Sequence, residues 1–340
     1  MSGDPRLTAE TPAADRTKYG PTNRAPSLTL DPPHVSRGLV YTVMFLLFVI
    51  WSNSFHAVTY FRTTVHVSAF DLVTMRFGPV ALFCIPYCLW RWRETRAIFA
   101  RDGLRVALMA LCMVPFYNLA LNWGQGRVPP ATASLIITMN PVFTLLLAVA
   151  FLGEKLRWSK VFGFVVAFLG VYLLVRTQRG SFGSGYELYA LVVLLAPLSW
   201  AIAAVLGKPA TSRGDPMLLS ITATGLGSLP FLGTMILGTG GVHTIMRDLT
   251  FTGWAALMHL SILCTIVGFA AYFWALGKLP ASSVSAFVFL NPPLTAAFGA
   301  LWRTEAFHWS TVVYGSVTLA GVAIGSGVLA RRGRERCGPG

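Results

Sequence analysis

Two Asn-Pro pairs are the first candidates for chemistry in this sequence, because each stands inside a long apolar stretch. At Asn140-Pro141 and Asn291-Pro292 the proline removes one backbone donor and clashes with the carbonyl group four residues before it. In a bilayer the freed carbonyl groups must find partners in the protein or in a water-lined cavity. Broken helices at matching depths are typical of solute-binding sites in membranes, so we predict that Asn140 and Asn291 bind a small molecule. The alternative is that both pairs only kink helices that pack against their neighbours.

Polar and aromatic side chains in other apolar stretches extend this candidate site. They are Trp51, Asn53, Tyr117, Asn118, Asn122, Trp200, His259 and Tyr272. Tyr117, Asn118 and Asn122 fall near one face of a helix, and polar groups in a membrane cost free energy unless they face the interior of a helix bundle. We therefore predict that these side chains point inward, either to bind substrate or to form hydrogen bonds between helices.

Arg76 is the one charged residue deep inside an apolar stretch. A buried arginine either binds an anionic group or fastens helices by donating hydrogen bonds to carbonyl oxygens. No arginine occurs at the related place later in the chain, near Gly225 to Gly227. We favour the structural role for Arg76. If its side chain instead faces the site, the substrate should be anionic.

The titratable groups limit the chemistry that the apolar stretches can support. No carboxylate lies deep inside them, so only His56, His259 and Asp71 could carry protons along a pathway, and proton coupling is possible rather than required. A lone histidine in a membrane is more often a packing residue. The scattered histidines offer neither a nucleophile with a base nor a cluster of metal ligands, so we expect no enzyme activity, no cofactor and no metal.

Composition places the chain in a membrane. Its 340 residues are 54% hydrophobic and only 12% charged, and the mean hydropathy is +0.61. In soluble domains, by contrast, about a quarter of all residues are charged. The net charge of +14 comes from basic residues at the ends of apolar segments, where they set topology. We therefore expect a lipid bilayer and a small-molecule substrate as partners, and no nucleic acid.

Ten apolar segments are each long enough to cross a bilayer, which takes about 20 residues per helix. They cover residues 38–60, 67–90, 104–123, 130–153, 158–176, 185–208, 215–237, 251–276, 281–302 and 309–330. Short linkers such as Arg101-Asp102-Gly103, Gly180 to Gly185 and Gly238 to Gly241 separate them. The sequence thus predicts an all-α integral membrane protein with ten transmembrane helices.

An internal repeat relates the two halves of the chain at an offset of 151 residues. Residues that match under this offset are Trp123 with Trp274, Gly126 with Gly277, Pro129 with Pro280, Ser134 with Ser285, Asn140 with Asn291, Glu154 with Glu305, and Trp158 with Trp309. Trp51 matches Trp200 if a gap of two residues is allowed. A repeat of about half the chain, made of apolar segments, is typical of a pseudosymmetric transporter.

Charge counting gives the orientation. One side of the predicted bundle holds 20 Lys and Arg residues and the other holds 6, and positive charge is retained in the cytoplasm. Both termini should therefore be cytoplasmic. Because each repeat has five helices, an odd number, the second repeat should enter the membrane inverted relative to the first. We expect a disordered cytoplasmic tail at 1–37, repeats at 38–180 and 185–330, and a basic cytoplasmic tail at 331–340.

The pattern resembles the EamA-type members of the drug/metabolite transporter superfamily over about residues 38 to 330. The resemblance is carried by the Trp51 region, the segment from Asp71 to Arg76-Phe77, both Asn-Pro pairs, Leu152 to Leu156, Gly163, Gly170-Val171, Glu305 and Gly321-Val322. It implies two five-helix repeats around a cavity lined by segments 1, 3, 4, 6, 8 and 9. It also implies export of amino acids or related small metabolites from the cytoplasm.

The function that we predict is secondary transport at a cavity in the middle of the cell (plasma or inner) membrane, by alternating access. No Walker-type nucleotide loop is present, so ATP is not the driver. The alternatives left open are a membrane sensor, a non-coupled channel, an importer and a nucleotide-sugar-like transporter.

Overall fold

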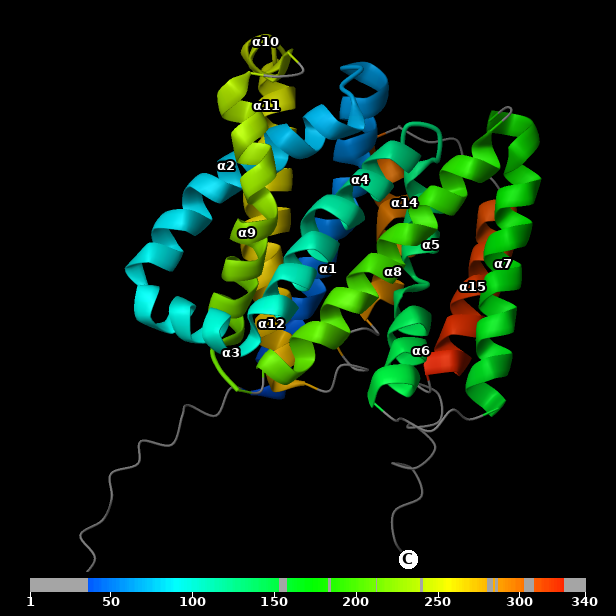
Figure 1. Ribbon diagram of the computed structural model, residues 1–340. Coiled ribbons are helices and arrows are strands. Elements are labelled where there is room, and N and C mark those ends of the chain that lie inside the picture. Colours follow the sequence, from blue (N-terminus) through cyan, green and yellow to red (C-terminus); the bar gives the residue numbers. More distant parts are fainter. Residues whose placement is uncertain are drawn as a thin grey trace, which may run out of the picture. The chain divides into compact units, whose positions relative to one another are not determined.

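The computed structural model describes residues 36–152, 158–182, 185–211, 213–238, 241–279, 284, 287–302 and 309–326. The predicted tail at 1–37, except for its last two residues, and the predicted tail at 331–340 lie outside these ranges. Glu154 and Glu305 lie outside them as well. Within the described ranges the regular secondary structure is helical, and none of it is strand (Figure 1).

The first half of the chain forms α1 to α7. Their bounds are α1 (Arg37–Thr59), η2 (Tyr60–Thr64), α2 (Ala69–Trp90), α3 (Trp92–Leu111), η3 (Cys112–Phe116), α4 (Tyr117–Gly124), α5 (Pro130–Ile137), α6 (Asn140–Leu152) and α7 (Trp158–Phe182). Runs such as α3–η3–α4 are continuous, because π-helical turns join α-helices without a break in hydrogen bonding.

The second half continues in the same style from α8. Its bounds are α8 (Tyr186–Thr211), α9 (Pro216–Leu237), α10 (Val242–Arg247), α11 (Phe251–Met258), η5 (His259–Val267), α12 (Gly268–Lys278), η6 (Phe287–Leu290), α14 (Asn291–Trp302) and α15 (Trp309–Ser326). Seven of the described helical runs are long and apolar enough to cross a membrane, and shorter apolar helices occupy 161–174 and 287–302. The chain therefore supplies helices for several crossings.

Both Asn-Pro pairs interrupt their helices, as the sequence predicts. α5 ends at Ile137 and α6 begins at Asn140, while the 3-10 turn η6 ends at Leu290 and α14 begins at Asn291. The prolines at 141 and 292 thus occupy the second position of a new helix, where the missing N–H costs no hydrogen bond. The breaks are local features of the sequence, and they lie 151 residues apart.

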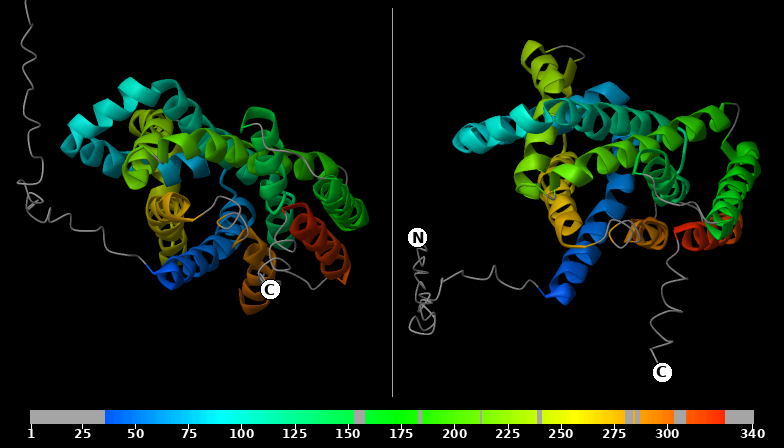
Figure 2. Two further views of the ribbon diagram at one scale, coloured as in Figure 1. Left: turned by 90° about the horizontal axis from the view of Figure 1, so that it is seen from below. Right: turned by 60° about the horizontal axis from the view of Figure 1, so that its bottom comes forward.

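Small residues let α7 and α15 approach closely (Figure 2, green and red). A Cβ added at Gly170 would lie 2.7 Å from the backbone nitrogen of Thr318, and one at Gly321 would lie 2.7 Å from the carbonyl oxygen of Gly163. Glycine is therefore required at both positions for this contact.

The predicted linkers agree with the structure at one place and are more helical than predicted at others. The predicted linker at Arg101-Asp102-Gly103 is a kink at which two helices meet within α3, because the backbone of Asp102 is not helical, with φ −131° and ψ 26°. The segment predicted to begin at residue 104 therefore does follow a break. The helix before the kink, which begins at Trp92, was not predicted, although arginine and glutamate favour helix. α7 continues to Phe182, beyond the predicted end at 176, and the short α10 follows the predicted linker at Gly238 to Gly241.

Ion pairs connect the α2–α3 turn to the α8–α9 turn. Arg91 Nη1 donates to Asp215 Oδ2 at 2.5 Å, and the buried Asp102 carboxylate accepts from Arg101 at 2.8 Å and Arg105 at 3.0 Å. Asp215 also caps α9, since its Oδ1 accepts from the backbone N–H of Met217 at 2.9 Å. Partial burial raises the pKa of Asp215, but Arg91 and the capping N–H groups outweigh it, so that this pKa lies below its ordinary value.

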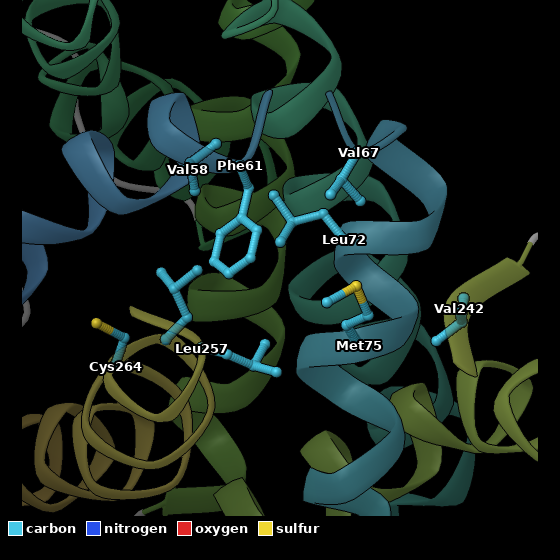
Figure 3. Packing of buried hydrophobic residues seen from close by; sticks show 9 residues of the cluster. Val58, Phe61, Val67, Leu72, Met75, Val242, Leu257 and Cys264 are labelled. Atoms are coloured by element: carbon cyan, nitrogen blue, oxygen red, sulfur yellow. The ribbon is translucent and has the colours of Figure 1, made fainter. Parts of the chain in front are cut away.

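A packed apolar cluster joins the end of α1 to α2, α10 and η5 (Figure 3). Its members are Val58, Phe61, Val67, Leu72, Met75, Val242, Leu257, Leu260 and Cys264, all buried. Val58 also faces the cavity described next, so the cluster bounds that cavity on one side.

Candidate functional site

A cavity lies where the two helix breaks meet α1, α4, α8 and α12. It brings together six of the side chains that the sequence singled out: Trp51, Tyr117, Asn140, Trp200, Tyr272 and Asn291. The space open to the centres of water molecules is about 60 Å³. Because one water needs about 10–15 Å³ by this measure, the cavity holds a few waters as it stands.

Aromatic rings form most of one wall. The Trp200 ring centroid lies 5.1 Å from that of Phe269, 5.3 Å from Tyr272, 5.4 Å from Tyr117 and 5.7 Å from Trp51. Most of these pairs meet edge to face, which the ring quadrupoles favour. The wall can bind an apolar or aromatic group, and a tryptophan face can also attract an ammonium group.

Trp51 is held in place by the π-helical segment η5. Its Nε1 donates to the carbonyl oxygen of Cys264 at 2.9 Å. A Cβ at Gly268 would lie 2.6 Å from this nitrogen, so the glycine makes room for the indole. π-Helical turns are frequent at functional sites.

The two asparagines are fixed in related but different ways. Asn140 Nδ2 donates to the carbonyl oxygen of Pro197 in α8 at 3.2 Å. Asn291 Oδ1 lies 3.0 Å from the hydroxyl of Ser52 in α1, and that hydroxyl is 2.6 Å from the carbonyl oxygen of Phe48. Each asparagine therefore ties a broken helix to a neighbouring helix and also lines the cavity.

Arg76 lines the cavity too, and this adds α2 to the expected walls. Its Nε donates to Thr265 Oγ1 at 2.9 Å and its Nη1 donates to Asn118 Oδ1 at 3.1 Å. The guanidinium carbon lies 5.0 Å from the Phe77 ring centroid. Arg76 thus has the fastening role that the sequence analysis favoured, and it also faces the cavity.

Four predicted site residues lie outside the cavity lining. Asn118 is fully buried, and its Nδ2 donates to the η3 carbonyl oxygens of Met113 at 3.0 Å and Val114 at 2.9 Å. Asn53 accepts from Trp302 Nε1 at 3.0 Å, and His259 Nε2 donates to Ile50 O at 3.2 Å. Asn122 is buried in α4 with both amide atoms unpartnered. The contacts of Asn53 and His259, and that of Asn118 with Arg76, join helices, which is the alternative stated for such residues; Asn122 makes no such contact.

The phenylalanines of the wall were not singled out from the sequence. Phe48, Phe55 and Phe269 line the cavity, yet in a membrane chain a phenylalanine facing a cavity has the same sequence signature as one facing lipid. Phe269 carries a weak signal, because it precedes Tyr272 by three residues and so shares its helix face.

The residues that the structure describes contain no group of three or more His, Cys, Asp or Glu side chains that could hold a metal ion. Asp71, a candidate for proton transfer, lies at the start of α2, where Ser68 Oγ donates to its Oδ2 at 2.6 Å and accepts from its N–H at 3.0 Å. The site's chemistry is therefore that of one guanidinium, two amides and an aromatic wall.

Comparisons with known proteins find relatives that are named as transporters. The chain is 28% identical over 298 residues to a probable terminal-alkyne amino-acid exporter of Streptantibioticus cattleyicolor, covering 87% of this chain and 96% of the relative. It is 28% identical to an uncharacterized transporter of Archaeoglobus fulgidus, covering 84% and 97%. It is 22% identical to the uncharacterized inner membrane transporter YedA of Escherichia coli, covering 76% and 81%.

A solved crystal structure shows the same fold, with a TM-score of 0.59 at 19% identity, covering 87% of this chain and 99% of that chain. The family model described as the EamA-like transporter family matches residues 38–176 and again residues 187–326. With its apolar helices, the chain is a multi-pass membrane protein. It belongs to the EamA-like transporter family.

Proposed function

We propose that this protein is a secondary transporter that exports small metabolites, such as amino acids, from the cytoplasm. The observation that carries the proposal is the cavity at the two helix breaks, lined by Asn140, Asn291 and the aromatic wall. Broken helices at matching positions are typical of substrate sites in secondary transporters. A solute bound there would be exposed to each side of the membrane in turn as the two halves rock about the site.

The frame that we propose has ten spans in two inverted five-helix repeats, at 38–180 and 185–330. Three observations support it: the family model matches twice, the breaks at Asn140 and Asn291 lie 151 residues apart, and so do Gly170 and Gly321 at the α7–α15 contact. The π-helical segments η3 and η5 also overlap under this offset. Sliding of α7 on α15 would let the halves move.

The proposed orientation has both termini in the cytoplasm of a plasma or inner membrane. It rests on the excess of Lys and Arg on one side, which includes the Arg91 and Arg101 to Arg105 region. The exporter among the relatives supports outward transport of an amino-acid-like solute. The small cavity favours such a solute over a nucleotide sugar, because bound ligands are largely enclosed in their sites.

Counterflow in proteoliposomes tests this function. Purified protein would be loaded with each member of a panel of amino acids and small metabolites, and uptake of the labelled solute would be followed with and without a pH gradient. We expect exchange of one solute class. Its dependence on the pH gradient separates proton antiport from uncoupled exit, and accumulation against a gradient separates a transporter from a channel or sensor.

Three asparagine variants locate the site within the same assay. We expect Asn140→Ala and Asn291→Ala to lower exchange at least about tenfold, equivalent to about 1.4 kcal/mol. Asn53→Ala is the matched control, because Asn53 lies off the cavity lining and should keep exchange near the wild-type rate. Exchange that persists in both cavity variants, or that is absent for the whole panel in the wild-type protein, would overturn the proposal.

A further inference from the structure

Arg76 carries a charge that no acidic group in the described residues compensates. It is 6% exposed, and none of the ion pairs between described residues includes it. Its two hydrogen-bond partners, Thr265 and Asn118, are neutral. A buried charge with only neutral partners is costly, and charged groups inside membranes are usually paired or placed at a solute pathway.

The guanidinium also keeps donors free for a ligand. Arginine has five N–H groups in a planar fork, and the two hydrogen bonds to Thr265 and Asn118 leave the Nη2 group without a partner among the described residues. Of the described side chains that line the cavity, Arg76 alone carries a full charge. The two contacts fix the orientation of the guanidinium group, and a group that is already ordered binds an anion at a lower cost in conformational entropy.

We infer that Arg76 binds the carboxylate of the transported solute, and that the solute is a small amphipathic monocarboxylate whose remaining part contacts the aromatic wall of Trp51, Trp200 and Tyr272. This inference rests on the proposed transport function. One monoanion neutralises one guanidinium, whereas a phosphate dianion would leave a buried negative charge. A carboxylate also matches the planar fork with two parallel hydrogen bonds.

The test compares solutes that differ only in the carboxylate. For each amino acid that exchanges in proteoliposomes, its amide and its deaminated acid would be offered as competitors to wild-type protein. We expect the free acid to compete at least about tenfold better than the amide, because the amide lacks the anion. The deaminated acid should compete like the amino acid if the wall binds an apolar body, and worse if the wall binds the ammonium group.

Variants assign the preference to Arg76. In Arg76→Gln the acid and the amide should compete equally, within about twofold, while Arg76→Lys should keep a reduced preference for the acid because it keeps the charge. Arg62→Gln is the matched control: Arg62 donates to the Val67 carbonyl oxygen outside the cavity lining, so its loss should leave the preference unchanged. Ligand-induced thermal stabilisation of the purified variants gives the same comparison without transport.

The outcomes separate the two claims. If the wild-type protein exchanges solutes but accepts amides as well as acids, the Arg76 inference is wrong and the transport function stands. If Arg76→Gln and Arg62→Gln both lower exchange while the acid preference persists in Arg76→Gln, Arg76 is structural only and the inference is wrong. If no solute exchanges in the wild-type protein, the transport function falls and this inference falls with it.

Discussion

Arg76 and Gly227 lie 151 residues apart and occupy comparable contacts, yet they differ in chemistry. Arg76 in α2 reaches Thr265 of η5, whereas Gly227 in α9 packs against Val114 of η3, and Thr265 and Val114 are also 151 residues apart. A Cβ at Gly227 would lie 2.5 Å from the Ala110 carbonyl oxygen. One contact thus holds a charged side chain and the other holds two backbones in close approach. Two positions with similar packing can therefore differ in chemistry: Arg76 brings a charge to the cavity, and Gly227 does not.

At the α7–α15 contact, in contrast, the two matching positions have the same residue type. Gly170 packs on Thr318 and Gly321 packs on Ala167, and these two pairs again match at 151 residues. Away from the cavity, then, both positions keep small residues, because the helices must meet closely. Substitutions at Gly170 and Gly321 test whether the two positions are equivalent, and substitutions near the cavity test the difference between its two walls.

Gly170→Ala and Gly321→Ala should destabilise the protein most and by similar amounts. Either methyl group would press on backbone atoms of the partner helix, and overpacking of this kind costs about 1–3 kcal/mol. Thermal unfolding of the purified variants measures the loss. Gly233→Ala is the matched control, because nothing lies within 4 Å of its added Cβ. Unequal losses of stability in Gly170→Ala and Gly321→Ala would show that the two positions are not equivalent.

Gly227→Ala and Thr265→Val should have different effects, because Gly227 serves close packing and Thr265 holds the Arg76 side chain. The first should lower stability by about 1–2 kcal/mol through its clash with Ala110. The second has nearly the shape of threonine but removes the Nε partner of Arg76, a hydrogen bond to a charged group worth about 1.5–3 kcal/mol before the side chain adjusts. We expect its main effect on the acid-over-amide preference in competition assays. A loss of stability with an unchanged preference in Thr265→Val would contradict this account.

Ser52→Ala should affect only the Asn291 side of the cavity. Trp200 lies 149 residues after Trp51, and at that spacing Ser52 corresponds to Ala201, which has no hydroxyl. Loss of the 3.0 Å contact to Asn291 should cost about 0.5–1.5 kcal/mol in thermal unfolding and lower exchange a few-fold. An exchange rate equal to that of the wild-type protein would show that Asn291 is positioned without Ser52.

Asp215→Asn should have the smallest effect, because asparagine keeps the N-cap of α9 and only the ion pair with Arg91 is lost. Exposed ion pairs contribute about 0.2–1 kcal/mol. The lowered pKa of Asp215 means that this contribution is present above its ordinary pKa of 3.8 and is lost as the pH falls through the lower folded value. Thermal unfolding should therefore separate the two proteins at pH 7 and bring them together in acid; a difference that grows in acid would contradict the assignment.

The sequence was most informative where local chemistry decides the structure. The prolines at 141 and 292 lack a backbone N–H and favour the start of a helix, so the breaks could be predicted. The helix before the kink at Asp102 could not, because the Asp102 carboxylate pairs with Arg101, Arg105 and the distant Arg213, and these contacts hold a charged segment in place.

At the candidate site the sequence separated polar from apolar residues but not cavity from helix contact. Asn118 and Asn140 are alike in the sequence, yet one bonds to Arg76 and the backbone while the other lines the cavity. Helix rotation and π-helical turns decide between these places, and both depend on packing across the whole bundle. For the same reason the sequence marked Arg76 as unusual, but it could not show that Arg76 both fastens helices and lines the cavity.

The most direct test of the central claim is to fill the cavity. Ile137 lines it and is buried, so Ile137→Trp should place an indole where the solute binds and lower counterflow at least about tenfold in a folded protein. Leu146→Trp in α6 is the control, because Leu146 is 40% exposed on the outside of the helix. We predict that only the first variant stops exchange. Equal exchange by both variants would show that the solute crosses elsewhere.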